Sequence, residues 1–184
     1  MKKVSIINFS GHHKGNGENI SLYMSEYMKK KKIDVEEIGF SDIDAHGCGI
    51  CEYECFTKDR HCPYMEDGIV HIYKTIASSD FCFFIIPNYS DVPCSNYFIF
   101  RERSQCVVDN NLWQQYAKTK KHFIVISSTS RDYFISLLKN EIIDQELNIT
   151  FFNSNDVGSK TISGDFLEYT YFLHLLDQIL NKYV

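Results

Sequence analysis

Two apolar runs in the middle of the chain most constrain its fold. The first is "FCFFIIP" at residues 81–87, and the second lies within "KHFIVISSTS" at residues 121–130. A half-exposed strand alternates apolar and polar side chains, whereas a short continuous apolar run is typical of a strand buried on both faces. Such strands occur in parallel sheets that carry helices on both sides. The two runs therefore predict the centre of a parallel sheet.

The rest of the chain alternates strands and helices around these runs. Further strands are predicted at residues 4–9, 33–40 and 148–153. Helical spacing predicts a helix from about Gly17 and others at 68–77, within 96–118, at 131–147 and at 165–183. About five strands alternating with about five helices predict an α/β fold with a three-layer, doubly wound, five-stranded parallel sheet. We expect one domain over residues 1–184, with a cysteine-bearing loop at about 41–64.

Composition excludes several classes of protein. The net charge of −5 at pH 7 leaves no basic surface for nucleic acid, and 44% hydrophobic residues indicate a packed globular domain. No run approaches the ~18 apolar residues of a membrane span, and the start of the sequence lacks the long apolar stretch of a secretory signal. We therefore expect a soluble cytoplasmic protein that binds neither nucleic acid nor membranes. In that reducing setting its 7 cysteines favour thiol, metal or redox chemistry over disulfides.

Small polar residues follow three of the predicted strands. The loops are "SGHHKGNG" at 10–17, "PNYSDVP" at 87–93 and "SSTS" at 127–130. In doubly wound sheets, ligands bind beyond the carboxyl ends of the strands, so these loops are expected along one rim. The first loop opens a helix, whose free N–H groups suit a phosphate, although a flexible glycine-capped turn is the alternative. Its glycines, at 11, 15 and 17, match neither a Walker loop nor the dinucleotide fingerprint.

Three segments resemble one known family. "NFSGHHKGNG" resembles the phosphate loop of flavodoxin-like NAD(P)H-dependent FMN reductases, and "CGICEYEC" with the following "MEDGI" resembles their cysteine-bearing segment. "ASSDFCFFIIPNYSDVPCSNYFIFRER" resembles their Pro-x-Tyr segment and the acidic-Arg pair after it, so the likeness spans roughly residues 4–103. It implies a flavodoxin-like fold, bound FMN, and NAD(P)H as co-substrate. The implied reaction passes hydride from NAD(P)H to FMN and then to a small acceptor or an iron–sulfur cluster.

Loop chemistry and the resemblance together give the expected FMN-binding set. The phosphate is expected at Ser10, His12, Lys14, Gly15, Asn16 and Gly17, and the ring at Pro87, Asn88, Tyr89, Ser90, Ser127, Ser128 and Thr129. His12 stands where the family usually has Arg, and Gly17 stands where it has Thr or Ser. We therefore expect Gly17→Thr to add a donor and tighten FMN binding. Two alternatives stay open: an electron-transfer flavoprotein that serves electron-carrier partners without a substrate pocket, and a diverged module without flavin.

The cysteine segment carries a second candidate site. Its spacing is Cys48-x2-Cys51-x3-Cys55-x6-Cys62, and compact runs of four thiolates are typical of iron–sulfur clusters. In the iron–sulfur flavoprotein branch of the family, similar cysteines hold a 4Fe–4S cluster. Zinc is an alternative because His46 and His61 flank the cysteines, and metal-free thiols are another.

The closing helix predicts assembly. Residues 165–183 are apolar over more than one face, so Phe166, Tyr171 and Leu175 are left over once one stripe packs on the sheet. Such a surplus favours a homo-oligomer, of which two-fold dimers are the commonest kind. The alternative is that the cysteine segment covers this helix within one chain.

Overall fold

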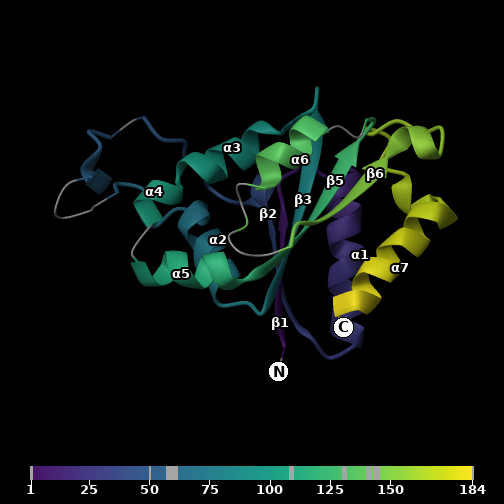
Figure 1. Ribbon diagram of the computed structural model, residues 1–184, viewed down its shortest axis with the longest axis horizontal. Coiled ribbons are helices and arrows are strands. Elements are labelled where there is room, and N and C mark those ends of the chain that lie inside the picture. The colour runs from purple at the N-terminus through teal and green to yellow at the C-terminus, as the bar shows by residue number, and fades with distance from the viewer. Residues whose placement is uncertain are drawn as a thin grey trace.

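A five-stranded parallel sheet forms the centre of the computed structural model, which describes residues 2–49, 51–56, 62–107, 110–129, 132–139, 142 and 146–183 (Figure 1). The strands run in the order β2-β1-β3-β5-β6. Their bounds are β1 (Lys3–Asn8), β2 (Asp34–Gly39), β3 (Phe81–Tyr89), β5 (Lys120–Ser127) and β6 (Asn148–Asn153). A two-residue strand, β4 (Val92–Pro93), pairs antiparallel with the end of β3. This is the flavodoxin-like strand order, so the predicted fold is confirmed.

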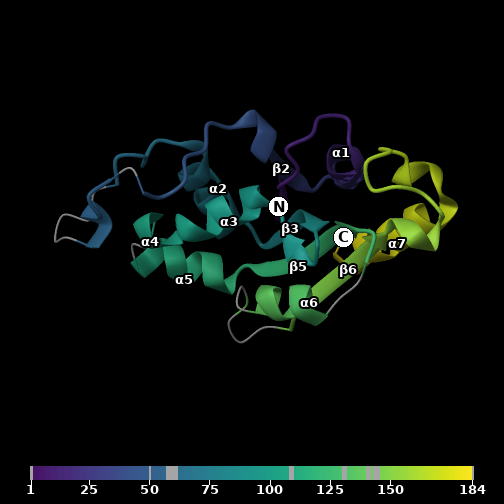
Figure 2. The ribbon, with the colours of Figure 1, turned by 90° about the horizontal axis from the view of Figure 1, so that it is seen from above.

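Helices cover both faces of the sheet and give it three layers. On one face lie α1 (Asn16–Lys30) and α7 (Thr170–Tyr183), as Figure 2 shows from above. The other face carries α2 (Gly68–Ala77), α3 (Ser95–Glu102), α4 (Ser104–Val107), α5 (Asn110–Lys118) and α6 (Asp132–Lys139). Within the described part of the chain, no helix combines the length and the apolar character that a membrane crossing needs.

The central strands explain the continuous apolar runs of the sequence. In β3, Phe83 and Ile85 pack in the core under α1 and α7, whereas Phe84 and Ile86 pack in the core on the opposite face. All four side chains are fully buried. Because alternate residues of a strand point to opposite faces, a strand with a core on each side needs apolar residues at every position.

Three helices differ from their predicted bounds. The region 96–118 divides into α3, α4 and α5, and the helix predicted at 131–147 is the shorter α6. The helix predicted at 165–183 begins only at Thr170, after a 3-10 turn at Phe166–Glu168. Phe166 is fully buried and stacks on Phe172 with ring centroids 4.6 Å apart, so it is not a spare surface residue. Tyr171 is 53% exposed and remains a spare apolar residue on the surface, and the homo-oligomer stays a prediction.

Candidate functional site

A cavity of about 260 Å³ lies beyond the carboxyl ends of β1 and β3, where the strand order reverses. Ligands bind at this position in doubly wound sheets. Its lining combines the loop after β1, the end of β3, one residue of β5 and the segment before α7: Ser10, His12, His13, Lys14, Gly15, Asn16, Gly17, Pro87, Asn88, Tyr89, Ile126, Thr161 and Ile162. The structure thus brings two of the three predicted loops to one cavity. The predicted set had omitted His13, Ile126, Thr161 and Ile162.

The loop after β1 presents the start of α1 to the cavity. Gly15 is the N-cap residue and has no side chain to cap the helix, while the Glu18 carboxylate of the first turn accepts a hydrogen bond from the Lys14 N–H. The first N–H groups of a helix have no partner within it, and the helix dipole gives them a partial positive charge. Lys14 and His12 line the same space. This arrangement favours an anionic group such as a phosphate.

Side chains inside the loop fix its path and explain Gly17. The Ser10 N–H donates to Asn8 Oδ1 at 3.0 Å, and the His12 N–H donates to Ser10 Oγ at 3.2 Å. A Cβ atom at Gly17 would lie 2.7 Å from Asn8 Oδ1 and 2.9 Å from the Ser10 Cβ. Those distances are shorter than any relaxed contact. A side chain at residue 17 therefore requires Asn8 and Ser10 to shift, and the effect of Gly17→Thr on FMN binding stays a prediction.

Asn16 lies in the lining, but its side chain is engaged elsewhere. Its Nδ2 donates to the Thr161 carbonyl at 2.9 Å, and its Oδ1 accepts from the Phe166 N–H at 2.9 Å. The side chain is 3% exposed. Asn16 therefore ties the segment before α7 to the start of α1, and its side-chain amide is not free to bind a ligand.

The end of β3 turns back through a tight hairpin. Ser90 and Asp91 have φ of 54° and 66°, and Tyr89 pairs with Val92 across them. Two consecutive left-handed residues match the type I′ hairpin turn, which favours Asn, Asp and Gly. A serine in that conformation is uncommon, and such residues concentrate at functional sites. The hairpin leaves Tyr89 53% exposed at the cavity, and its partial burial raises the pKa of its phenol.

The third predicted loop supports the hairpin from behind. Asn88 Nδ2 donates to Ser127 Oγ at 2.7 Å, and Thr129 Oγ1 donates to Asp91 Oδ1 at 2.9 Å. Ser127 and Thr129 are therefore not in the cavity lining, and neither are Ser90 and Ser128; Ser130 lies outside the described residues. Sequence reasoning placed these loops on the correct rim but did not separate the residues that face the cavity from those that brace it.

One buried acceptor in this site lacks a partner. Asn88 Oδ1 is buried and accepts no hydrogen bond from any described residue. Leaving a buried polar atom unsatisfied costs roughly 1–3 kcal/mol. The Ser127 hydroxyl accepts from the amide nitrogen of Asn88 on its other side, so the orientation of the amide is fixed.

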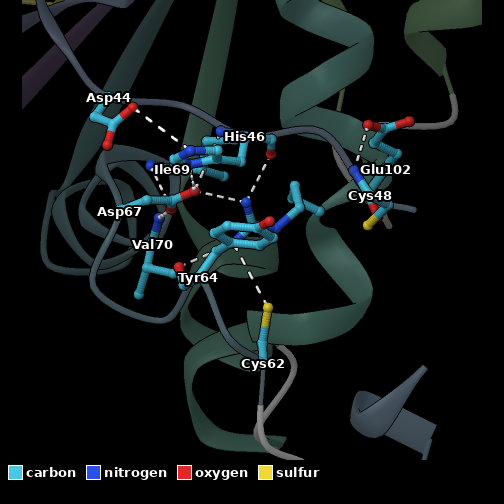
Figure 3. A network of polar contacts seen from close by, with 10 residues as sticks. Asp44, His46, Cys48, Cys62, Tyr64, Asp67, Ile69, Val70 and Glu102 are labelled. Carbon is cyan, nitrogen blue, oxygen red and sulfur yellow. Dashed lines mark hydrogen bonds and ion pairs between the residues drawn. The ribbon is translucent and has the colours of Figure 1, made fainter. Parts of the chain in front are cut away.

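The cysteine segment is anchored by a buried ion pair. Arg103, which is fully buried, donates from Nη1 to Asp67 Oδ2 at 2.6 Å and to the His46 carbonyl at 2.7 Å. Its Nη2 donates to the Tyr64 carbonyl at 3.0 Å. Asp67 also caps α2 by accepting from the backbone N–H groups of Ile69 and Val70 (Figure 3). The acidic-Arg pair of the resemblance thus includes the residue that holds both ends of the cysteine segment.

The four predicted metal ligands are not gathered in this structure. Cys48 is exposed and donates its backbone N–H to Glu102 Oε1 at 2.7 Å, whereas Cys62 is buried 3.8 Å from Arg103 Nη2 (Figure 3). Burial, followed by the nearby Glu102 carboxylate, raises the pKa of the Cys48 thiol. Among the described residues, no three His, Cys, Asp or Glu side chains are placed to hold a metal ion. His61 lies outside those residues, and the metal site stays a prediction.

Comparison with known proteins identifies the fold. No family model matches the chain, and no curated protein matches it. The solved structure of the NADH:FMN oxidoreductase EMOB in its apo form matches 99% of this chain and 90% of its own, with a TM-score of 0.59 and 9% identity. FerB, a flavoenzyme NAD(P)H:(acceptor) oxidoreductase from Paracoccus denitrificans, matches 98% and 96%, with a TM-score of 0.55 and 11% identity. Oxidised flavodoxin 1 from Bacillus cereus matches 100% and 99%, with a TM-score of 0.50 and 10% identity. These likenesses show a flavodoxin-like fold.

The tight packing at Gly17 generates a first prediction. Gly17→Ala should lower the free energy of unfolding by about 1–3 kcal/mol, because the added Cβ overpacks the loop even though alanine favours helices. Gly17→Thr should lower it further. Gly15→Ala is the matched control, since its Cβ would meet the His12 carbonyl at an ordinary 3.5 Å. Urea unfolding of the three variants checks this, and a Gly17→Ala protein as stable as Gly15→Ala would contradict it.

The buried ion pair generates a second prediction. Asp67→Ala should lower the free energy of unfolding by about 3–5 kcal/mol, because it removes the buried carboxylate beside Arg103 and the cap of α2. The control is Asp44→Ala, whose side chain is 84% exposed and which should change stability by less than about 0.5 kcal/mol. Thermal and urea unfolding measure both variants. Equal stability of the two would show that the ion pair contributes nothing.

Proposed function

We propose that this protein is an FMN-dependent oxidoreductase that takes hydride from NAD(P)H and reduces a small acceptor. One observation carries the proposal. At the switch point of a flavodoxin-like sheet, the start of α1 lines a cavity together with Asn88, whose buried Oδ1 lacks a partner among the described residues. The cavity therefore offers a place for an anion and a fixed acceptor for a neutral donor. The fold shared with EMOB and FerB supports the same reading.

The described residues fit FMN at each of its chemical parts. The N–H groups of residues 15–17, together with Lys14 and His12, suit the phosphate. Asn88 Oδ1 suits a donor of the flavin. Pro87, Tyr89 and Ile126 add apolar surface of the kind that lines sites for flat ligands. When bound, FMN would supply the hydride and electron chemistry, while these residues bind and orient it.

An electron-transfer flavoprotein is the second candidate function, and the cysteine segment favours it. Four cysteines within residues 48–62 are more than a simple reductase needs, and a cluster there would accept single electrons from the flavin. The two candidates differ in their need for a nicotinamide cofactor. A reductase oxidises NAD(P)H by itself, whereas a carrier relies on protein partners.

FMN binding is the decisive test of the proposed function. Titration of the protein should quench FMN fluorescence with one site per chain, because one cavity adjoins both the start of α1 and the end of β3. Asn88→Leu should weaken binding about tenfold, since it removes the buried acceptor while keeping the size of the side chain. Asn181→Leu, an exposed change on α7 outside the cavity, is the control. No binding at large FMN excess would sink the proposal and favour a diverged module without flavin.

Oxidation of NADH or NADPH separates the two candidate functions. The FMN-loaded protein should oxidise at least one of them in the presence of a quinone or free flavin, and the decrease in absorbance of the reduced nicotinamide measures it. The expected result is turnover that depends on added FMN. Tight FMN binding without any nicotinamide oxidation would instead support the electron carrier.

The cysteine spacing generates a prediction about metal. Protein prepared without oxygen should carry about four irons per chain if the thiolates hold a 4Fe–4S cluster. About one zinc per chain would point to a tetrahedral structural site instead. Protein free of both metals would contradict the cluster, and elemental analysis alongside the visible spectrum distinguishes the three outcomes.

A further inference from the structure

We propose that Ile162 is a further binding residue of this site and packs against the flavin ring, an inference that rests on the proposed function. Ile162 lies on the segment between β6 and α7, which the predicted FMN-binding set did not include. It is 86% exposed and yet lines the cavity. An apolar side chain has no hydrogen bond to offer a phosphate, so it can recognise only the apolar part of the ligand.

The segment that carries Ile162 is seated firmly on the phosphate loop. Asn16 bonds the Thr161 carbonyl and the Phe166 N–H, and Asn19 Nδ2 donates to the Gly164 carbonyl at 2.8 Å. These bonds bracket Ile162 on both sides. Figure 2 shows the loop after β1 beside the loop that leads into α7. The position of Ile162 is therefore set by the first turn of α1.

Close packing and an internal bond also define the segment. Gly164 has φ of 73°, and a Cβ there would lie 2.9 Å from the Lys14 carbonyl, so only glycine allows this approach. Ser159 Oγ donates to Asp165 Oδ1 at 2.8 Å and closes the segment on itself. Phe166 anchors its end in the core. Ile162 thus stands at the tip of a closed loop whose base is fixed.

A bound ligand would explain why the apolar side chain of Ile162 is exposed in the free protein. Burying an isoleucine side chain that is exposed in the free protein stabilises a complex. Tyr89, another large and exposed apolar side chain, lines the same cavity from the β3–β4 hairpin. Two such side chains from different elements, beside a polar helix start, match a ligand that joins a flat ring to a phosphate. Ile162 is assigned to the ring.

Comparison of two flavins tests this assignment. FMN and riboflavin share the ring, but riboflavin lacks the phosphate. Ile162→Ser should raise the Kd for both by about tenfold, whereas Lys14→Gln should raise the Kd for FMN alone. Ile162→Val should stay within about threefold of wild type. Tyr171→Ser, which removes an exposed apolar side chain of α7 outside the cavity, should change neither Kd.

The outcomes separate this inference from the proposed function. The inference fails and the function stands if wild type binds FMN and Ile162→Ser binds both flavins as tightly as wild type does. The same holds if Ile162→Ser raises the Kd for FMN alone. If wild type binds neither flavin, both fail. A second readout applies if riboflavin binds too weakly to be measured. Ile162→Trp should place its indole against the ring and shift the visible absorption of bound FMN. A bound spectrum identical to that of wild type would overturn the inference.

Discussion

Burial of β3 and β5 on both faces is the constraint on which the rest of the structure depends. A strand with a core on each side must be flanked by helices, and helices on both sides of a parallel sheet require crossover connections. Those connections send the five strands β1, β2, β3, β5 and β6 in the same direction, so their carboxyl ends lie along one edge. The position of the cavity at that edge is therefore a consequence of the same apolar runs that form the core.

Amide side chains join the loops at this edge. Asn8 shapes the loop after β1, Asn16 binds the segment before α7, and Asn88 connects the end of β3 to Ser127 of β5. Each uses a side chain to satisfy backbone or hydroxyl groups that lie beyond the regular ladders, where polar groups still need partners. Of these three amides, only Asn88 has an oxygen without a partner among the described residues.

Much of the fold could be predicted from sequence because local patterns determine it. The apolar runs located β3 and β5, and the strand Asn148–Asn153 was predicted with its observed bounds. Distant contacts were not predictable. Ile162 lies far from Gly17 in sequence and has no motif, so only folding reveals that Asn16 brings its segment to the cavity. The role of Gly17 was missed for a similar reason, since the packing of Asn8 and Ser10 against it depends on three-dimensional distance rather than on residue type.

The buried guanidinium of Arg103 joins the cysteine segment to the core of the domain. Its guanidinium donates to the His46 carbonyl on one side of the segment and to the Tyr64 carbonyl on the other. It also donates to Asp67, which caps the start of α2. A deletion that included His46 or Tyr64 would remove an acceptor from this buried cation, and a buried charge is tolerated only while it stays compensated. Substitution of Cys48 would leave these bonds to Arg103 unchanged, whereas substitution of Cys62 would alter the surroundings of the buried guanidinium.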